Sequence, residues 1–177
     1  AALLGAALMV AVGALTIDEA YSAIDLETIT LLLGMMIVAA NLRLSGFFRM
    51  VEAFVIARAR RPLVLLAAIV VVAGFFSALL VNDTICLVMT PIVLGLVRRL
   101  GRNPVPYLLA VAMASNAGSV ATLTGNPQNM IVGTLAGISY GDFARALTPV
   151  AIAGLAITMV LVALLHPREF LTRERLP

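Results

Sequence analysis

The sequence predicts an all-α integral membrane protein. Of its 177 residues, 62% are hydrophobic and only 12% are charged, and tryptophan is absent. The mean hydropathy of +1.10 lies far above the range of soluble domains. Long apolar runs alternate with short charged segments, which is typical of several membrane-spanning helices. The twelve basic residues gather between these runs, and this indicates membrane topology, not a nucleic-acid-binding surface.

Residues 1–61 are predicted to hold scaffold-type transmembrane helices and an interfacial amphipathic helix. Residues 1–15 are apolar but give only about 22 Å of helix against a core of ~30 Å, so we expect part of this helix to precede the sequence. The acidic loop 17–27 is expected outside, and the next helix follows over 28–42. Five arginines then mark the cytoplasmic side: Arg43, Arg49, Arg58, Arg60 and Arg61. Within this interval apolar residues recur at helical spacing from Phe47 to Val55, which predicts a helix lying on the inner membrane surface.

The most informative stretch is Asn82-Asp83-Thr84, which places a carboxylate between the apolar runs 63–80 and 85–97. Arginines flank both ends of 62–99, so both ends are expected in the cytoplasm. The second leg, residues 84–97, gives only about 21 Å of helix, too little for a comfortable crossing. The segment either crosses the membrane twice or forms a re-entrant hairpin, and the short second leg favours a re-entrant hairpin over 62–99 with its tip inside the membrane.

Residues 104–136 predict a discontinuous transmembrane helix, because helix-breaking polar residues interrupt the apolar block at 122–129. Asn126 followed by Pro127 is typical of an N-cap and first helical position, so a half-helix is expected to run from there to about Gly133 or Leu135. Residues 137–177 predict an outer turn at 139–142, a last crossing over 147–165 and a cytoplasmic tail. The predicted transport region is thus 62–136, within four crossings and one hairpin.

We interpret the two polar breaks as facing halves of one binding site. Each is expected to begin a half-helix whose unpaired amides and positive dipole end bind anions or orient polar solutes. Asp83 is the only acid within an apolar run and is the candidate for the coupling proton, with a capping role as its alternative. If the coupling ion is Na⁺, its expected ligands are Asn82, Gly125 and Asn126. The full set of candidate solute and ion ligands is Asn82, Asp83, Thr84, Thr124, Gly125, Asn126, Pro127, Gln128 and Asn129.

Other polar residues have simpler explanations. Thr122 and Thr124 can bond back to their own helix, and the small polar residues 115–119 favour close helix packing over ligand contact. Cys86 is the single cysteine, which excludes an intramolecular disulfide, and we interpret it as a small apolar filler. His166 is interpreted as a histidine at a cytoplasmic helix end.

Two segments, ALLVNDTICLVMTP (78–91) and NAGSVATLTGNPQN (116–129), resemble the ion transporter superfamily. This superfamily includes arsenite efflux permeases, citrate and other di- or tricarboxylate symporters, Na⁺/H⁺ antiporters and the melanosomal P protein. The resemblance covers nearly the whole chain, as the N-terminal half of a protein about twice as long. It implies an inverted-repeat transporter in which hairpin and broken helix meet at the membrane midplane, with a homodimer and elevator-like movement.

By this resemblance, Asn82, Asp83 and Thr84 take the hairpin tip, and Gly125, Asn126, Pro127 and Asn129 the break in the partner helix. Sodium-carboxylate symporters usually have Ser-Asn-Thr at the tip. The presence of Asp83 in this sequence favours proton coupling, as in arsenite-permease-like members.

We therefore expect a multi-pass protein of the inner (plasma) membrane that acts in secondary transport. Its solute would be a small inorganic or organic anion, or a neutral metalloid acid such as arsenite, exchanged for H⁺. The alternatives are a sodium-coupled di- or tricarboxylate symporter and, from another class, a non-transporting membrane subunit or assembly module. The expected partners are the solute, the lipid bilayer, the second half of the transporter and a second copy. We expect no cofactor beyond a coupling ion, H⁺ or Na⁺, no nucleic acid and no enzymatic activity, because the sequence offers no nucleophile–base pair.

Overall fold

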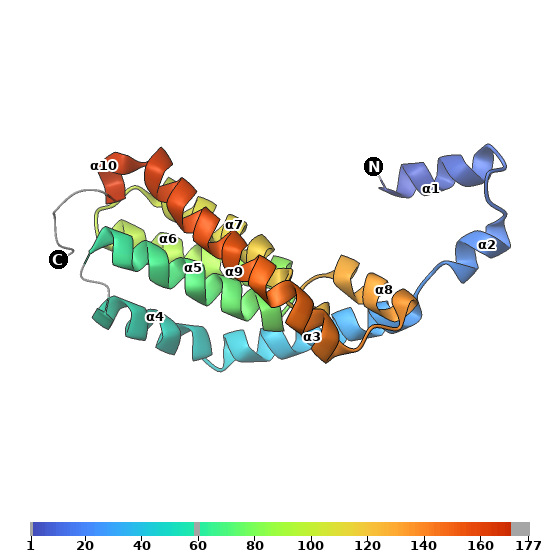
Figure 1. The fold of residues 1–177 in the computed structure, drawn as a ribbon, viewed down its shortest axis with the longest axis horizontal. Coiled ribbons are helices and arrows are strands. Elements are labelled where there is room, and N and C mark those ends of the chain that lie inside the picture. Colours follow the sequence, from blue (N-terminus) through green and yellow to red (C-terminus); the bar gives the residue numbers. More distant parts are fainter. Residues whose placement is uncertain (1, 59–60, 171–177) are drawn as a thin grey trace.

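The computed structural model describes residues 2–58 and 61–170, and each regular element in these residues is a helix (Figure 1). This confirms the predicted all-α class. A short 3-10 helix, η1, replaces α-helix between α7 and α8. The elements are α1 (Ala2–Ala11), α2 (Ile17–Ser22), α3 (Leu26–Leu44), α4 (Phe47–Arg58), α5 (Pro62–Leu79), α6 (Asn82–Arg99), α7 (Pro104–Ser119), η1 (Leu123–Gly125), α8 (Pro127–Ala136), α9 (Tyr140–Leu165) and α10 (Pro167–Phe170).

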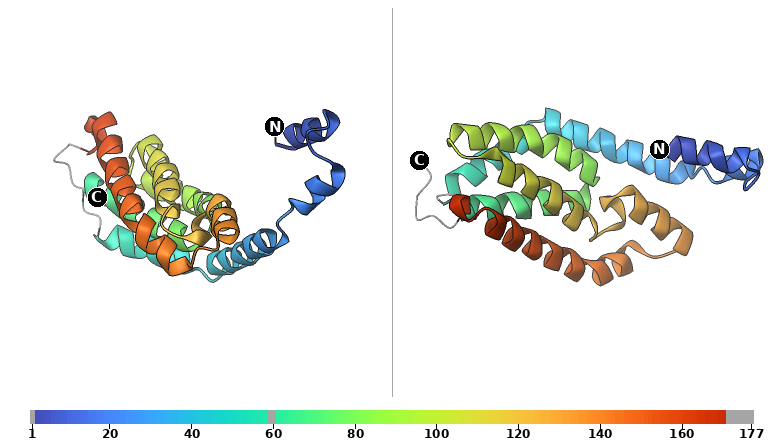
Figure 2. Two further views of the ribbon diagram at one scale, coloured as in Figure 1. Left: turned by 45° about the vertical axis from the view of Figure 1, so that its right-hand side comes forward. Right: turned by 90° about the horizontal axis from the view of Figure 1, so that it is seen from above.

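The packed part of the molecule consists of α5, α6, α7 and α9. Helix α7 lies against each of the other three, and α9 also contacts α5. Figures 1 and 2 show these helices side by side, with α8 and the N-terminal part of α3 extending beyond the α5–α6 turn. Helix α1 lies apart from the bundle, with its main contact to α2. The bundle therefore positions the hairpin and the broken helix next to each other.

Three helical segments of the described chain are long and apolar enough to cross a membrane, namely Ile17–Leu44, Pro62–Leu79 and Tyr140–Leu165. Helix α1 has 10 residues, about 15 Å, so the predicted first crossing is shorter than a full span. The predicted grouping into residues 1–61, 62–136 and 137–177 stays a prediction.

Two predicted loops are partly helical. The acidic loop at 17–27 contains α2, whose N-cap Thr16 forms a capping box with Glu19, and it ends at Asp25, the N-cap of α3. The predicted outer turn at 139–142 consists of the N-cap Ser139 and the first turn of α9. Local capping bonds explain both differences, because a capped polar segment can enter a helix as readily as it can form a turn.

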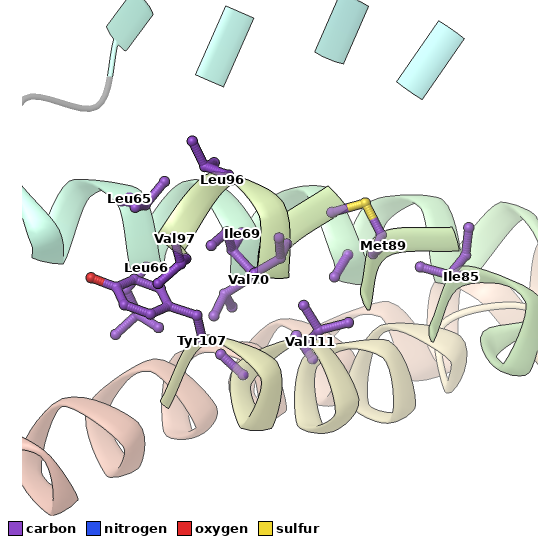
Figure 3. Packing of buried hydrophobic residues seen from close by; sticks show 14 of the residues in the cluster. Leu65, Leu66, Ile69, Val70, Ile85, Met89, Leu96, Val97, Tyr107 and Val111 are labelled. Atoms are coloured by element: carbon purple, nitrogen blue, oxygen red, sulfur yellow. The ribbon is translucent and has the colours of Figure 1, made fainter. Parts of the chain in front are cut away.

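Buried aliphatic side chains from α5, α6 and α7 form the core (Figure 3). Leu65, Leu66, Ile69 and Val70 of α5 are at most 2% exposed, and their spacing places them on one side of that helix. Since lipid is as apolar as these side chains, close packing supplies most of the attraction between the helices. The core residues that Figure 3 labels from the other two helices are Ile85, Met89, Leu96, Val97, Tyr107 and Val111.

Helices α5 and α7 approach so closely that their backbones touch at Gly74 and Gly118. A Cβ atom added at Gly118 would collide with the backbone of Gly74. The neighbouring residues at this crossing, Ser77, Ala114 and Ser115, are small and fully buried. Small residues at such positions allow close contact between membrane helices, and here they bring the polar ends of the two helices together.

The two legs of the hairpin have equal length, because α5 and α6 contain 18 residues each, or about 27 Å. The prediction of a short second leg over 84–97 is therefore wrong. Asn82, Asp83 and Thr84 form the first turn of α6 and not a loop before it, and the helix continues to Arg99. A re-entrant course now depends on the flanking arginines and stays a prediction.

Helix α4 confirms the helix predicted after Phe47, and part of its apolar face packs on protein. Phe47 and Phe48 make edge-to-face ring contacts with Phe76 of α5 at centroid distances of 5.4 and 5.6 Å. Phe48 and Val51 line a narrow gap together with Val72, so α4 runs antiparallel beside α5. Its placement at the membrane interface stays a prediction. The predicted cytoplasmic arginines at 60, 173 and 175 lie outside the described residues.

We expect Gly118→Ala to destabilise the full-length protein by about 1–3 kcal/mol, because the added methyl group forces α5 and α7 apart. The measurement is the midpoint of thermal unfolding in detergent. Gly95→Ala is the matched control, since a Cβ atom at Gly95 in the middle of α6 meets no atom within 4 Å, and alanine is the better helix former. Equal midpoints for the two variants would contradict the proposed backbone contact.

Candidate functional site

The hairpin tip and the break in the α7–α8 helix lie next to each other, as the sequence predicts. The Asn82 side chain, in the first turn of α6, donates a hydrogen bond from Nδ2 to Oδ1 of Asn116 at 2.9 Å. Beside it, the Ser115 hydroxyl donates to the carbonyl oxygen of Asn82 at 2.9 Å. Two adjacent residues of α7 therefore hold both the side chain and the backbone of the tip.

The end of α5 is tied to α7 in the same way. The buried Ser77 hydroxyl donates to the carbonyl oxygen of Ser115 at 2.6 Å, and the Thr122 hydroxyl donates to the carbonyl oxygen of Ala78. The second bond satisfies a carbonyl in the last turn of α5, which lacks an intrahelical partner. Hydroxyl groups on both sides thus donate to backbone carbonyls across the contact, Ser77 from α5 to α7 and Thr122 from the break to α5.

The break itself is organised by Asn126 and Asn129. Asn126 is the N-cap of α8 and accepts a hydrogen bond at Oδ1 from the Asn129 amide at 2.8 Å, with Pro127 in the first helical turn. This confirms the predicted start of the half-helix. Asn129 Nδ2 donates to the carbonyl oxygens of Ser119 and Thr122 at 3.1 and 2.8 Å. One side-chain amide therefore satisfies two backbone acceptors that the end of α7 leaves open.

A chain of hydrogen bonds that passes through the side chain and the backbone carbonyl of Asn116 connects the tip to the break. Asn126 Nδ2 donates to the Ser119 hydroxyl at 3.2 Å, and that hydroxyl donates to the carbonyl oxygen of Asn116 at 2.9 Å. Asn116 in turn holds Asn82. We call these five residues, Asn82, Asn116, Ser119, Asn126 and Asn129, the polar network. The network lies where two helices begin, so the unpaired amides and positive dipole ends of α6 and α8 border it.

The turn into α8 requires glycine at position 125 because there is no room for a side chain, and not because of its dihedral angles. Gly125 is buried, and a Cβ atom there would collide with the backbone carbonyl of Ser119. Thr124 is half-buried and lies 3.3 Å, hydroxyl to hydroxyl, from Tyr140 at the start of α9. The predicted site residues of the break are thus held mainly by local bonds within the break.

Six of the nine predicted site residues lie outside the polar network, among them Asp83, Thr84 and Gln128. Asp83 is exposed and makes no hydrogen bond or ion pair with the residues that the structure describes, so the capping alternative finds no support. Gln128 is exposed in the first turn of α8 and is likewise without a hydrogen bond to the described chain. Thr84 is half-buried and lines a groove between α6 and α3. In this chain Asp83 is accessible to a solute or to a further protein segment.

Sequence reasoning assigned Ser115, Asn116 and Ser119 to helix packing, and it did not single out Ser77 or Tyr140. The structure gives the first three both roles, because they pack closely and also bond the tip and the break. The available signal was their spacing, since residues 115, 116 and 119 share one side of a helix. The partner of that side could not be read from the sequence.

The described residues contain no group of three His, Cys, Asp or Glu side chains placed to hold a metal ion. Cys86 is half-buried in α6 and unpaired. His166 caps the end of α9, with its Nδ1 atom 3.3 Å from the carbonyl oxygen of Val162. The chemistry that this region offers is therefore that of amides, hydroxyls, helix ends and one exposed carboxylate.

Comparisons with known proteins agree with a membrane protein of a transporter family. The sequence profile of the family described as "Citrate transporter" matches residues 1–176. The silicon efflux transporter LSI3 of Oryza sativa subsp. japonica is 36% identical over 168 residues, which are 95% of this chain and 35% of that protein. The 46 kDa membrane protein of Mycobacterium leprae is 41% identical over 175 residues, 96% of this chain and 40% of that protein.

A more distant relative is the putative transporter arsB of Dictyostelium discoideum. It is 29% identical over 167 residues, 94% of this chain and 30% of that protein. The chain therefore spans 30% to 40% of the length of these three relatives.

We expect Asn129→Ala to destabilise the break by about 1–3 kcal/mol, because it leaves two backbone carbonyls without their shared donor. The thermal unfolding midpoint and the hydrogen exchange of the α8 amides measure the effect. Gln128→Ala is the matched control, since it removes a neighbouring exposed amide and should change stability by no more than about 0.5 kcal/mol. Similar losses in both variants would argue against the role given to Asn129.

Proposed function

Because the chain belongs to the citrate transporter family, we propose that it is the N-terminal half of a secondary active transporter in the inner (plasma) membrane. The transported solute is a small inorganic or organic anion or a neutral metalloid acid, and its movement is coupled to H⁺. The remaining part of the longer protein supplies an inverted second half, and two copies associate as a homodimer. The names of the relatives, which mention citrate, silicon efflux and arsB, motivate this range of solutes.

The observation that carries the proposal is the polar network within an otherwise apolar bundle. It connects Asn82 at the hairpin tip to Asn126 at the break through Asn116 and Ser119 of α7. A crossing of two uninterrupted helices needs few such groups, because close packing of small and apolar side chains can hold membrane helices together. Discontinuous helices with polar ends near the middle of the membrane are the usual binding elements of secondary transporters.

The proposed roles follow from the chemistry of the groups. The first turns of α6 and α8, at Thr84 and Pro127, orient the solute with unpaired amides and their positive dipole ends. Thr124, Gln128 and Asn129 line the break beside them. A Na⁺ ion in place of H⁺ would use Asn82, Gly125 and Asn126, where carbonyl and amide oxygens are available. The second half of the transporter completes the site from the other side.

Asp83 is the proposed proton carrier. It is exposed in this half and has no partner among the described residues. A second half can therefore close over it, so that its protonation state affects the movement of the solute. Protonation and deprotonation on the two sides of the membrane would then accompany solute movement.

The solute class is tested by flux measurements with the full-length protein in vesicles. Arsenite, silicic acid and citrate form the first panel, each with and without an imposed pH gradient. Flux of one of them that responds to the pH gradient supports the proposal. Flux that requires Na⁺ at fixed pH would instead indicate a sodium-coupled symporter.

We expect Asp83→Asn to abolish the response of solute flux to a pH gradient and to lower coupled flux at least about tenfold. The matched control is Asp142→Asn, because Asp142 forms a solvent-exposed ion pair with Arg145 at 3.1 Å at the start of α9. Unchanged flux and pH response in Asp83→Asn vesicles would rule out the proton role.

A further inference from the structure

Arg43 lies beside the first turns of α6, far along that helix from Arg99. It lines a groove of about 410 Å³ between α3 and α6 together with Thr84 and Leu87, which belong to the first two turns of α6. Helix α6 ends at Arg99, and this end is the one expected in the cytoplasm. From Val88, which also lines the groove, to Arg99 the helix rises about 16 Å, roughly half of the ~30 Å membrane core.

This guanidinium group has no protein partner in the described chain. Arg43 is exposed to the groove and forms no ion pair or side-chain hydrogen bond with the residues that the structure describes. Apart from Thr84 the other walls are apolar, namely Met36, Ala39, Ala40, Leu44, Leu87 and Val88. If this part of the hairpin lies inside the membrane, as predicted, a charge among apolar side chains is costly unless an opposite charge or water accompanies it.

A second groove continues the first along the same helix. It has a volume of about 350 Å³ and shares Arg43, Leu44 and Val88 with the first groove, while Arg49 and Pro91 extend it toward the base of the hairpin. The lining of both grooves includes two arginines and no acidic residue. The two grooves form a positively charged strip along α6 that leads to Thr84.

We propose that the groove between α3 and α6 is an anion-binding site in which Arg43 supplies the positive charge opposite Thr84. This inference rests on the proposed transport function and narrows the solute to an anion. A guanidinium offers several donors in a planar fork that fits a carboxylate or another oxyanion. The Thr84 hydroxyl and the first turn of α6 add donors from the other wall. Arg49, along the approach, raises the local concentration of anions.

Substitution of Asp83 is expected to change the affinity for an anion in the opposite direction from substitution of Arg43. Asp83 lies one helical turn before Leu87, on the same side of α6, so its negative charge opposes an anion bound between Thr84 and Arg43. Removal of that charge strengthens anion binding, whereas removal of the Arg43 charge weakens it. A purely structural role for these residues would not produce effects of opposite sign.

The experiment measures the equilibrium affinity of the purified full-length protein for citrate by isothermal titration calorimetry. We expect Arg43→Gln to weaken binding at least about tenfold, as the loss of a charged hydrogen bond requires. Arg43→Lys retains part of the affinity, because it keeps the charge and loses the fork. Asp83→Asn binds citrate more tightly than the unchanged protein. Arg99→Gln is the matched control, since Arg99 is exposed at the far end of α6, and its affinity stays unchanged.

Three results would overturn the anion site. The first is equal citrate affinity of Arg43→Gln and Arg99→Gln. The second is an unchanged protein that binds neither citrate nor sulfate in the millimolar range. The third comes from the double substitution Arg43→Cys and Thr84→Cys in a Cys86→Ala background, if a short thiol-specific cross-linker fails to join the two positions. This third measurement requires no transport. Binding that depends on Arg43 without any flux would refute the proposed transport function and leave the anion site standing.

Discussion

The constraint on which the rest of the structure depends is that a helix interrupted inside an apolar bundle must find partners for its exposed backbone groups. Helix α7 ends at Ser119, and α8 begins at Pro127. The carbonyl oxygens of Ser119 and Thr122 receive the Asn129 amide, and Asn126 caps the new helix. Each such group left unbonded would cost about 1–3 kcal/mol. The amide side chains after the break are therefore as much a structural necessity as a binding surface.

This solution works only because α5 and α7 pack closely. With Gly74 against Gly118, the backbones of the two helices meet, and the short hydroxyl side chain of Ser77 reaches the carbonyl oxygen of Ser115. A larger residue at the crossing would lengthen these bonds. The small residues of the bundle and the polar bonds at its end thus depend on each other, and together they hold the hairpin tip against the break.

The polar network and the charged residues near it have different properties. The network amides bond to one another and to backbone atoms, which gives them fixed positions. Asp83 and Arg43, in contrast, make no ion pair with the described residues. A rigid polar frame with unpaired charges at its edge is suited to a site in which the frame orients a solute and the charges respond to its presence.

The sequence alone predicts the helical membrane class, the position of the hairpin and the break, and the cap at Asn126-Pro127, because hydrophobic runs, arginine clusters and capping residues act locally. It misjudged the second leg of the hairpin, since the polar triplet Asn82-Asp83-Thr84 suits a first helical turn as well as a loop. Only the tertiary structure decided that Ser115 and Asn116 hold the tip and that Arg43 lies beside Thr84. The hydrogen bonds at the tip, and the groove that Arg43 and Thr84 share, involve residues more than thirty positions apart, and helix packing, which no local pattern encodes, brings them together.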